Sequence, residues 1–172
     1  MLGAGNSPSA CGIYYNDSIL PNDSQERIVT DLTRTQLVDT LNNGWGNYVA
    51  RYRALSPAKQ QQWLAGQGYA RFSDLLGHVV AWWVDGQQVI AHVAADPAYP
   101  LRDYVVDTFN AEAVAQYAAL DEDAMIAAYE QARAAWIPLI EGLSDTTFRN
   151  PKIADRLYPE IIGHLEEHAL PD

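Results

Sequence analysis

Two of the four histidines in this chain, His164 and His168, stand four positions apart in the segment 162–168 (IGHLEEH). If this segment is helical, residues at i and i+4 share one face, so both imidazoles can reach the same metal ion. Neutral imidazole is a common ligand for divalent transition metals. The spacing therefore predicts a metal site on a helix near the end of the sequence.

A third histidine, His78, lies within the strongest helical pattern of the chain. Two ligands from one helix and one from a facing helix would leave coordination positions open, which is typical of catalytic metal sites and not of closed structural ones. The single cysteine, Cys11, means that the ligands must be histidines and carboxylates. His92 stands two residues before the expected end of the same helix, and we expect it on the surface.

Two other interpretations of these residues stay open at this point. A histidine on a helix is often hydrogen-bonded in the core or solvated at the surface, without any metal. Residues 164–168 also fit His-x-x-Glu-His, the pattern of inverted zincin peptidases, with Glu167 as general base. Those enzymes need another ligand well downstream, and the sequence stops at Asp172, so a peptidase is disfavoured.

The charge and composition exclude several classes of partner. The formal net charge is -11 over 172 residues, and the eleven Lys and Arg are scattered, so no basic patch can neutralise nucleic-acid or lipid phosphates. No apolar segment approaches the roughly 18 residues that a membrane span requires. The start lacks the basic and apolar regions of a signal peptide, and one cysteine permits no internal disulfide. These observations predict a cytoplasmic protein.

Apolar residues recur at helical spacing along most of the chain, and no segment alternates as a strand does. A first helix is expected to begin at Thr33, whose Thr33-Arg34-Thr35-Gln36 sequence is a capping box, and Ser56-Pro57 to begin a short second element. Further helices are expected at 73–94, 102–119 and 124–143. Pro138 is expected to kink the helix at 124–143. A final helix is expected to begin at Tyr158-Pro159 and to end before Pro171. The expected inward positions are Leu37, Leu41, Trp45, Tyr48, Tyr52, Leu55, Leu75, Val79, Trp82, Val89, Val93, Tyr104, Val105, Phe109, Val114, Tyr117, Met125, Tyr129, Trp136 and Ile140.

This order of elements predicts an all-α protein, an antiparallel four-helix bundle with one extra short helix. Residues 1–30 carry no sustained apolar period and are rich in Asn, Ser, Asp, Gly and Pro. We expect them to form an irregular N-terminal extension and residues 31–172 to form a single helical domain.

Three short motifs, in this order and at these separations, resemble the DinB-like superfamily. They are residues 72–82 (FSDLLGHVVAW), residues 107–111 (DTFNA), and residues 162–168 (IGHLEEH), and the resemblance covers roughly residues 33–170. It implies a four-helix bundle, often a homodimer, whose triad of histidines holds zinc or nickel. Carried over to this sequence, the metal ligands would be His78, His164 and His168. The last helix of the family usually continues beyond the second histidine, whereas Pro171 ends it here.

Members of this superfamily include transferases and isomerases that use mycothiol, bacillithiol or glutathione, such as mycothiol-dependent maleylpyruvate isomerase. The resemblance therefore implies that a low-molecular-weight thiol binds the metal as thiolate and attacks a small electrophilic substrate. Two alternatives stay open. The related ClbS/DfsB group contains protective hydrolases that need no histidine triad, and a non-catalytic stress-response bundle would carry a structural or vestigial metal site.

Aromatic and acidic residues near the predicted ligands have two possible roles. Trp82, Trp83 and Tyr48 either line a substrate pocket or belong to the core, and helical spacing favours the core for Trp82. Asp85 and Glu167 are either hydrogen-bond partners of the ligands or a general base, or else solvated charges, and a solvated charge is the expectation for each.

Overall fold

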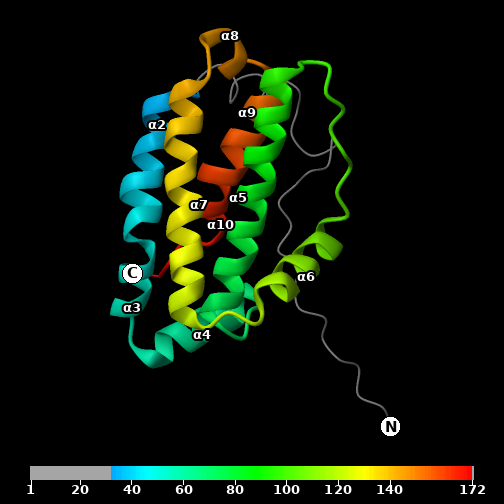
Figure 1. Ribbon diagram of the computed structural model, residues 1–172. Coiled ribbons are helices and arrows are strands. Elements are labelled where there is room, and N and C mark those ends of the chain that lie inside the picture. Colours follow the sequence, from blue (N-terminus) through cyan, green and yellow to red (C-terminus); the bar gives the residue numbers. More distant parts are fainter. Residues whose placement is uncertain (1–31, 172) are drawn as a thin grey trace.

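The computed structural model describes residues 32–171, which form helices and connections without any β-strand (Figure 1). The expected all-α class is therefore confirmed for this part of the chain. The predicted extension at residues 1–30 lies outside the described residues. Within residues 32–171, no helix combines the length and apolar character that crossing a lipid bilayer requires.

The first helical column begins at the predicted capping box. The Thr33 side chain accepts from the backbone N–H of Gln36, whose own side chain accepts from the backbone of Thr33. The column continues through α2 (Arg34–Asp39), a π-helical turn (Thr40–Gly44), a 3-10 turn (Trp45–Asn47) and α3 (Tyr48–Ala54). Its predicted stripe is buried at all positions except Leu55, which is half-buried at the end of α3.

The irregular turns in this column occur where the sequence has two glycines, Gly44 and Gly46. A Cβ atom at Gly44 would lie 2.4 Å from Cδ2 of Leu165. Glycine at this position therefore lets the last helix approach the first one closely, because any side chain would have to displace Leu165.

The next two helices begin where the sequence predicts. Ser56 caps α4 (Pro57–Gln67), with Pro57 in the first turn, and Gly68 ends it in the left-handed conformation at φ 81°. Helix α5 (Phe72–Ala95) is the longest element and carries His78. All five of its expected inward residues are buried.

The crossover after α5 differs from the prediction. A helix was expected over 102–119, but α6 spans only Val106–Tyr117, and residues 96–105 form an extended connection. Val105, expected to be buried, is 72% exposed. The reason is that the Tyr104 side chain contacts Asp85 of α5 and Arg156 of the last column. The backbone before α6 is therefore extended, and the Val105 side chain faces outward.

Helix α7 (Glu122–Gly142) matches its prediction. Asp121 caps it, acidic residues occupy the first turn, and the four expected inward residues are buried. Pro138 lies inside this helix.

The last column starts earlier than predicted. After the short α8 (Asp145–Phe148), Asn150 caps α9 (Pro151–Leu157), which continues into a π-helical segment (Tyr158–Gly163) and α10 (His164–Glu167). Tyr158-Pro159 therefore does not open the helix but lies within it. Pro159 cannot donate a backbone hydrogen bond, and the backbone widens there, with the N–H of His164 donating to the carbonyl of Pro159.

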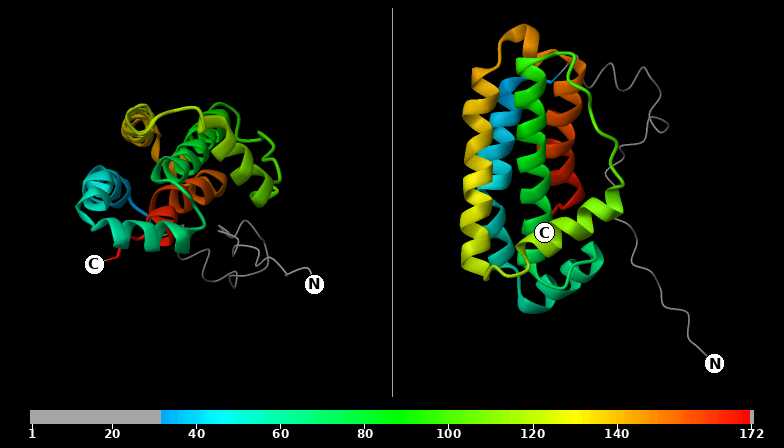
Figure 2. Two further views of the ribbon diagram at one scale, coloured as in Figure 1. Left: turned by 90° about the horizontal axis from the view of Figure 1, so that it is seen from below. Right: turned by 45° about the vertical axis from the view of Figure 1, so that its right-hand side comes forward.

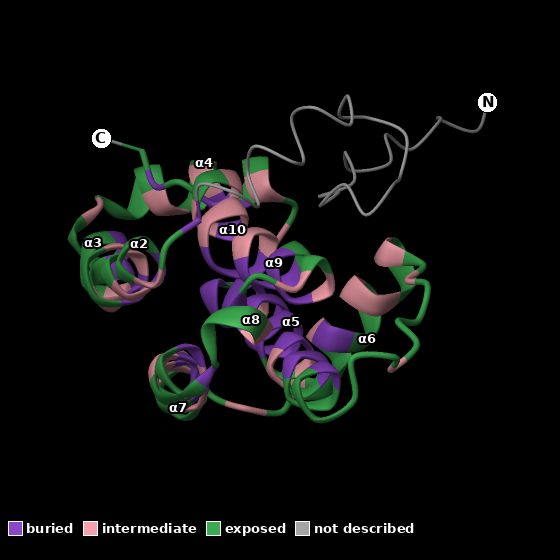
Figure 3. Cartoon of the chain, turned by 90° about the horizontal axis from the view of Figure 1, so that it is seen from above, coloured by how far each residue is buried: buried purple, intermediate pink, exposed green. Residues whose placement is uncertain are grey.

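Four columns lie side by side: α2–α3, α5, α7 and α9–α10 (Figures 1 and 2). The first and last columns run in one direction, and α5 and α7 run in the other, because the long crossover with α6 returns the chain to the end at which α5 began. Buried residues concentrate where α5, α9 and α10 meet the inner faces of the other columns (Figure 3). This region contains all three predicted ligands.

Candidate metal centre

The structure brings His78, His164 and His168 together in the interior. One ring nitrogen from each lies within 4.8 Å of one from each of the others. The ring centroid of His78 is 5.4 Å from both other rings, and His164 and His168 are 5.8 Å apart. Nitrogens bound to one zinc ion at about 2.0–2.1 Å are roughly 3.3 Å apart in tetrahedral geometry, so small side-chain rotations would close the site around an ion.

All three imidazoles are completely buried. Burial lowers the pKa of His78 to about 3 and that of His168 to about 4, and the positive charge on a neighbouring histidine adds to the effect at His78. The pKa of His164 is also lowered, first by burial and then by the other two histidines. The rings are therefore neutral at pH 7, which is the form that binds metal.

Within residues 32–171, neither ring nitrogen of His78 or His164 makes a hydrogen bond of good geometry. Buried polar groups in folded proteins are nearly always paired, and leaving one unsatisfied costs about 1–3 kcal/mol. Three neutral rings whose nitrogens lie within 4.8 Å of one another are the expected arrangement of ligands around an ion. The donor set therefore fits a divalent metal.

His168 is held by residues of two other helices, α3 and α4. Its Nδ1 lies 2.7 Å from Oε1 of Gln67, the last residue of α4, so Nδ1 donates and Nε2 keeps its lone pair. The hydroxyl of Tyr48 donates to the backbone carbonyl of His168 at 2.8 Å. These contacts fix the last ligand although α10 ends at Glu167.

His164 lies one helical turn after a buried carboxylate, Glu160. Nδ1 of His164 is 3.4 Å from Oε2 of Glu160, and both side chains are fully buried. The other carboxylate oxygen of Glu160 accepts from Arg156 at 3.1 Å. A buried carboxylate beside a ligand histidine is the usual means of orienting that ring.

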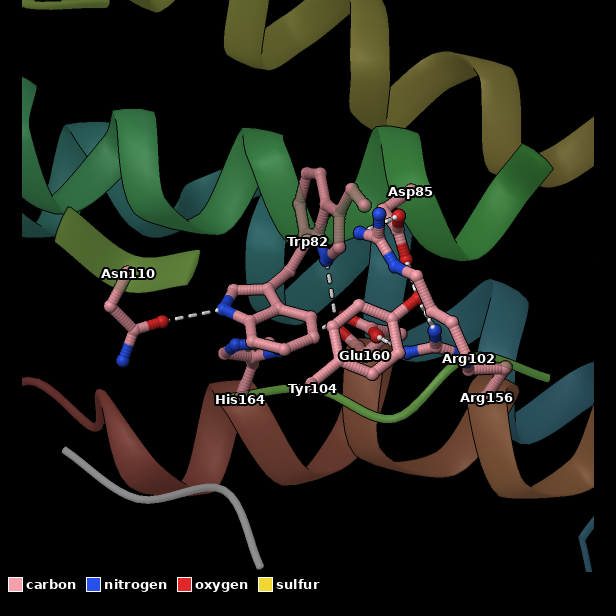
Figure 4. Close-up of polar contacts among 9 residues, drawn as sticks. Trp82, Asp85, Arg102, Tyr104, Asn110, Arg156, Glu160 and His164 are labelled. Atoms are coloured by element: carbon pink, nitrogen blue, oxygen red, sulfur yellow. Dashed lines mark hydrogen bonds and ion pairs between the residues drawn. The ribbon is translucent and has the colours of Figure 1, made fainter. Parts of the chain in front are cut away.

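Aromatic residues lie beside the three histidines. The ring of Tyr69 lies 5.7 Å from His78, and Trp82 lies 6.3 Å from His164. The Trp82 indole donates to Asn110 of α6 at 2.8 Å (Figure 4). The ring centroids of Trp82 and Phe109 are 4.1 Å apart. The side chain of Asn110 also acts on the pKa of His78, opposing the effect of burial.

A network of charged and aromatic side chains joins this region to the crossover (Figure 4). Asp85 of α5 pairs with Arg156 at 3.0 Å and with Arg102 at 2.7 Å. The Tyr104 hydroxyl also contacts Asp85 and Arg156, and both arginines lie over its ring. These contacts hold residues 102–104 of the crossover against the bundle.

The remaining predicted site residues have different positions. Trp82 is buried beside His164, whereas Trp83 lies in the core and donates to the carbonyl of Glu160 at 2.7 Å. Tyr48 also lies in the core, and its hydroxyl contacts the backbone of His168. Glu167 is half-buried outside the three-histidine group. His92 is exposed and stacks on Tyr99, as expected.

Sequence reasoning missed Gln67, Arg156 and Glu160, and it favoured a solvated charge for Asp85. Asp85 is instead mostly buried in two ion pairs. Glu160 carried a usable signal, because it stands four residues before His164 on the same helical face. Gln67 had none, since only packing brings α4 to the end of α10.

Comparisons with family models, with curated proteins and with solved structures found no match to this chain. The chemistry proposed below therefore depends on the geometry of the three histidines and on the motifs in the sequence.

Proposed function

We propose that this protein binds a divalent metal ion through His78, His164 and His168. The observation that carries the proposal is the convergence of three buried, neutral imidazoles from two helical columns, two of them without well-formed hydrogen bonds. Imidazole ligands suit zinc and nickel, the metals that the DinB-like motifs imply.

We further propose that the protein is a thiol-dependent transferase or isomerase acting on a small electrophile. When bound, the metal would supply a Lewis acid that holds a thiol as thiolate at neutral pH. The residues of the chain would supply orientation and exclusion of water, through the aromatic side chains of Tyr69, Trp82 and Phe109. The low-molecular-weight thiol would be of the mycothiol, bacillithiol or glutathione type. The DinB-like motifs also imply that the protein forms a homodimer.

A second function, a structural metal site in a binding protein, is favoured by one specific observation. All three imidazoles are completely buried, whereas a catalytic site must admit its substrate. A catalytic role therefore requires the crossover that covers Trp82 to move, and a structural role does not.

Metal analysis of the purified protein tests the metal site. We expect one ion per chain in the wild type and in His92→Ala, the control at an exposed histidine, and less than a tenth of that in His164→Ala. A wild type that takes up no stoichiometric Zn²⁺ or Ni²⁺ contradicts the proposal and favours a metal-independent activity such as that of ClbS/DfsB-like hydrolases.

A turnover assay separates the catalytic from the structural role. The metal-loaded protein is incubated with each of the three thiols and a panel of electrophiles. Conversion of the electrophile is measured together with consumption of the thiol, because a transferase consumes its thiol and an isomerase regenerates it. Turnover that disappears in His164→Ala supports the transferase or isomerase. Bound metal without turnover, together with unfolding at lower temperature after chelation, supports the structural role.

A further inference from the structure

We infer that Glu160 is a positioning residue for the metal centre: its Oε2 faces Nδ1 of His164, keeps the proton on that nitrogen, and leaves Nε2 of His164 as the metal-binding atom. This inference deepens the proposed function and rests on it. It concerns a residue that has no role in the sequence motifs.

The first support is the surroundings of Nδ1. This atom lies 3.4 Å from Oε2 of Glu160, and the backbone carbonyls of Glu160 and Pro159 also act on the ring. Nδ1 therefore faces the oxygen of a buried carboxylate. A neutral imidazole carries its single proton on the nitrogen that faces acceptors, so the lone pair lies on the other nitrogen.

The second support is the residue that holds the other oxygen of Glu160. Arg156 donates to Oε1 at 3.1 Å and is itself only 4% exposed. The backbone carbonyl of Glu160 accepts from Trp83, which holds the turn in place. The arginine therefore keeps one oxygen occupied and directs the other towards His164.

The third support is the local helix geometry. The π-helical segment (Tyr158–Gly163) contains Glu160 and ends where His164 begins. The opposite side of Glu160 faces α5, where a Cβ at Gly86 would lie 3.1 Å from Cγ of Glu160. Glycine at this position leaves the space that the buried carboxylate occupies.

The arrangement predicts two separable effects. An ionised carboxylate on Nδ1–H raises the basicity of Nε2 and fixes the ring plane, and loss of such a partner typically weakens metal binding by about 10–100-fold. The tautomer of His164 is set by the same contact and exists without metal. It can therefore be measured independently of whether the proposed function is correct.

The first experiment determines the His164 tautomer by long-range ¹H–¹⁵N NMR of the metal-free wild-type chain at pH 7.5, with His164→Gln used to assign its signals. We expect the proton on Nδ1. A proton on Nε2 overturns the inference, whatever the metal-binding result. This measurement needs no variant of Glu160, so it decides the question even if such a variant does not fold.

The second experiment titrates Co²⁺ into the wild type, Glu160→Gln and Asp85→Asn and follows visible absorbance. Asp85→Asn is the matched control, because it also removes a carboxylate partner of Arg156 but lies outside the contact with His164. We expect the Kd for Co²⁺ to rise about 10–100-fold in Glu160→Gln and to change by less than about threefold in Asp85→Asn.

Equal weakening in both variants would indicate that the ion network only supports the fold, and would overturn the positioning role. An unchanged Kd in folded Glu160→Gln would overturn it as well. If the wild type binds no Co²⁺, the proposed function fails, and the NMR tautomer alone then decides the role of Glu160.

Discussion

The rings of His78 and His164 lie 5.4 Å apart in the interior, although one belongs to α5 and the other to the last column of the bundle. Neither ring nitrogen of either residue makes a well-formed hydrogen bond within the described part of the chain. This relationship between two buried, uncharged imidazoles is the basis of the first two predictions below.

Metal binding should stabilise the folded chain, because the triad exists only in the native state. At a free Zn²⁺ concentration about 100 times the Kd, the free energy of unfolding should rise by about 2.7 kcal/mol. We expect thermal unfolding several degrees higher with Zn²⁺ than with chelator. His78→Ala should lose this difference and His92→Ala should keep it; a zinc effect of equal size in all three proteins would contradict the triad.

The metal-free protein should lose stability as the pH falls below about 6.5. In the unfolded chain the three histidines take up protons near pH 6.5, whereas the folded-state pKa is about 3 for His78 and about 4 for His168. The unfolded state thus binds more protons in this range, and the free energy of unfolding decreases with falling pH by up to about 1.4 kcal/mol per pH unit for each histidine.

Denaturant unfolding in chelator at pH 7, 6 and 5 measures this dependence. His78→Gln removes one of the buried titrating groups, so its slope between pH 6 and 5 should be smaller by roughly 1 kcal/mol per pH unit. A slope identical to that of the wild type would mean that His78 is not kept neutral by folding.

Gly86→Ala should destabilise the fold by about 1–3 kcal/mol, because overpacking a buried site forces its neighbours apart. A Cβ at Gly86 would lie 3.1 Å from Glu160 and 3.3 Å from the Trp136 ring, both fully buried. Gly66→Ala in α4 is the matched control, since its Cβ would meet nothing within 4 Å, and it should stabilise by about 0.5–1 kcal/mol. The same sign for both changes in chemical denaturation would contradict the close approach of α5 to the last column.

Tyr48→Phe should cost about 0.5–1.5 kcal/mol, because it leaves the buried carbonyl of His168 without its donor. Tyr52→Phe is the control one turn along α3; its ring stacks on Phe72, and its hydroxyl makes no hydrogen bond within residues 32–171. We expect Tyr52→Phe to cost less. Chemical denaturation of both variants gives the comparison, and the reverse order would exclude a supporting role of Tyr48 at the triad.

The helices with strong local signals could be predicted from the sequence. The capping box at Thr33 and the Ser56-Pro57 start both occur where expected, because each depends on neighbouring backbone groups only. The predictions for the crossover and the last column were less accurate. Val105 is exposed and Pro159 lies inside a helix, since tertiary contacts of Tyr104 and a π-helical segment override the local pattern there.

Some contacts of the candidate site could likewise be predicted from the sequence, and others depend on tertiary packing. Helix geometry by itself places His164 and His168 on one face, and the same spacing relates Glu160 to His164. Only the tertiary structure decides that His78 of α5 faces them, that Gln67 of α4 reaches His168, and that Arg156 joins Glu160 to Asp85. The physical reason is that backbone hydrogen bonding sets the period of a helix locally, whereas contacts between columns depend on how all the apolar faces pack together.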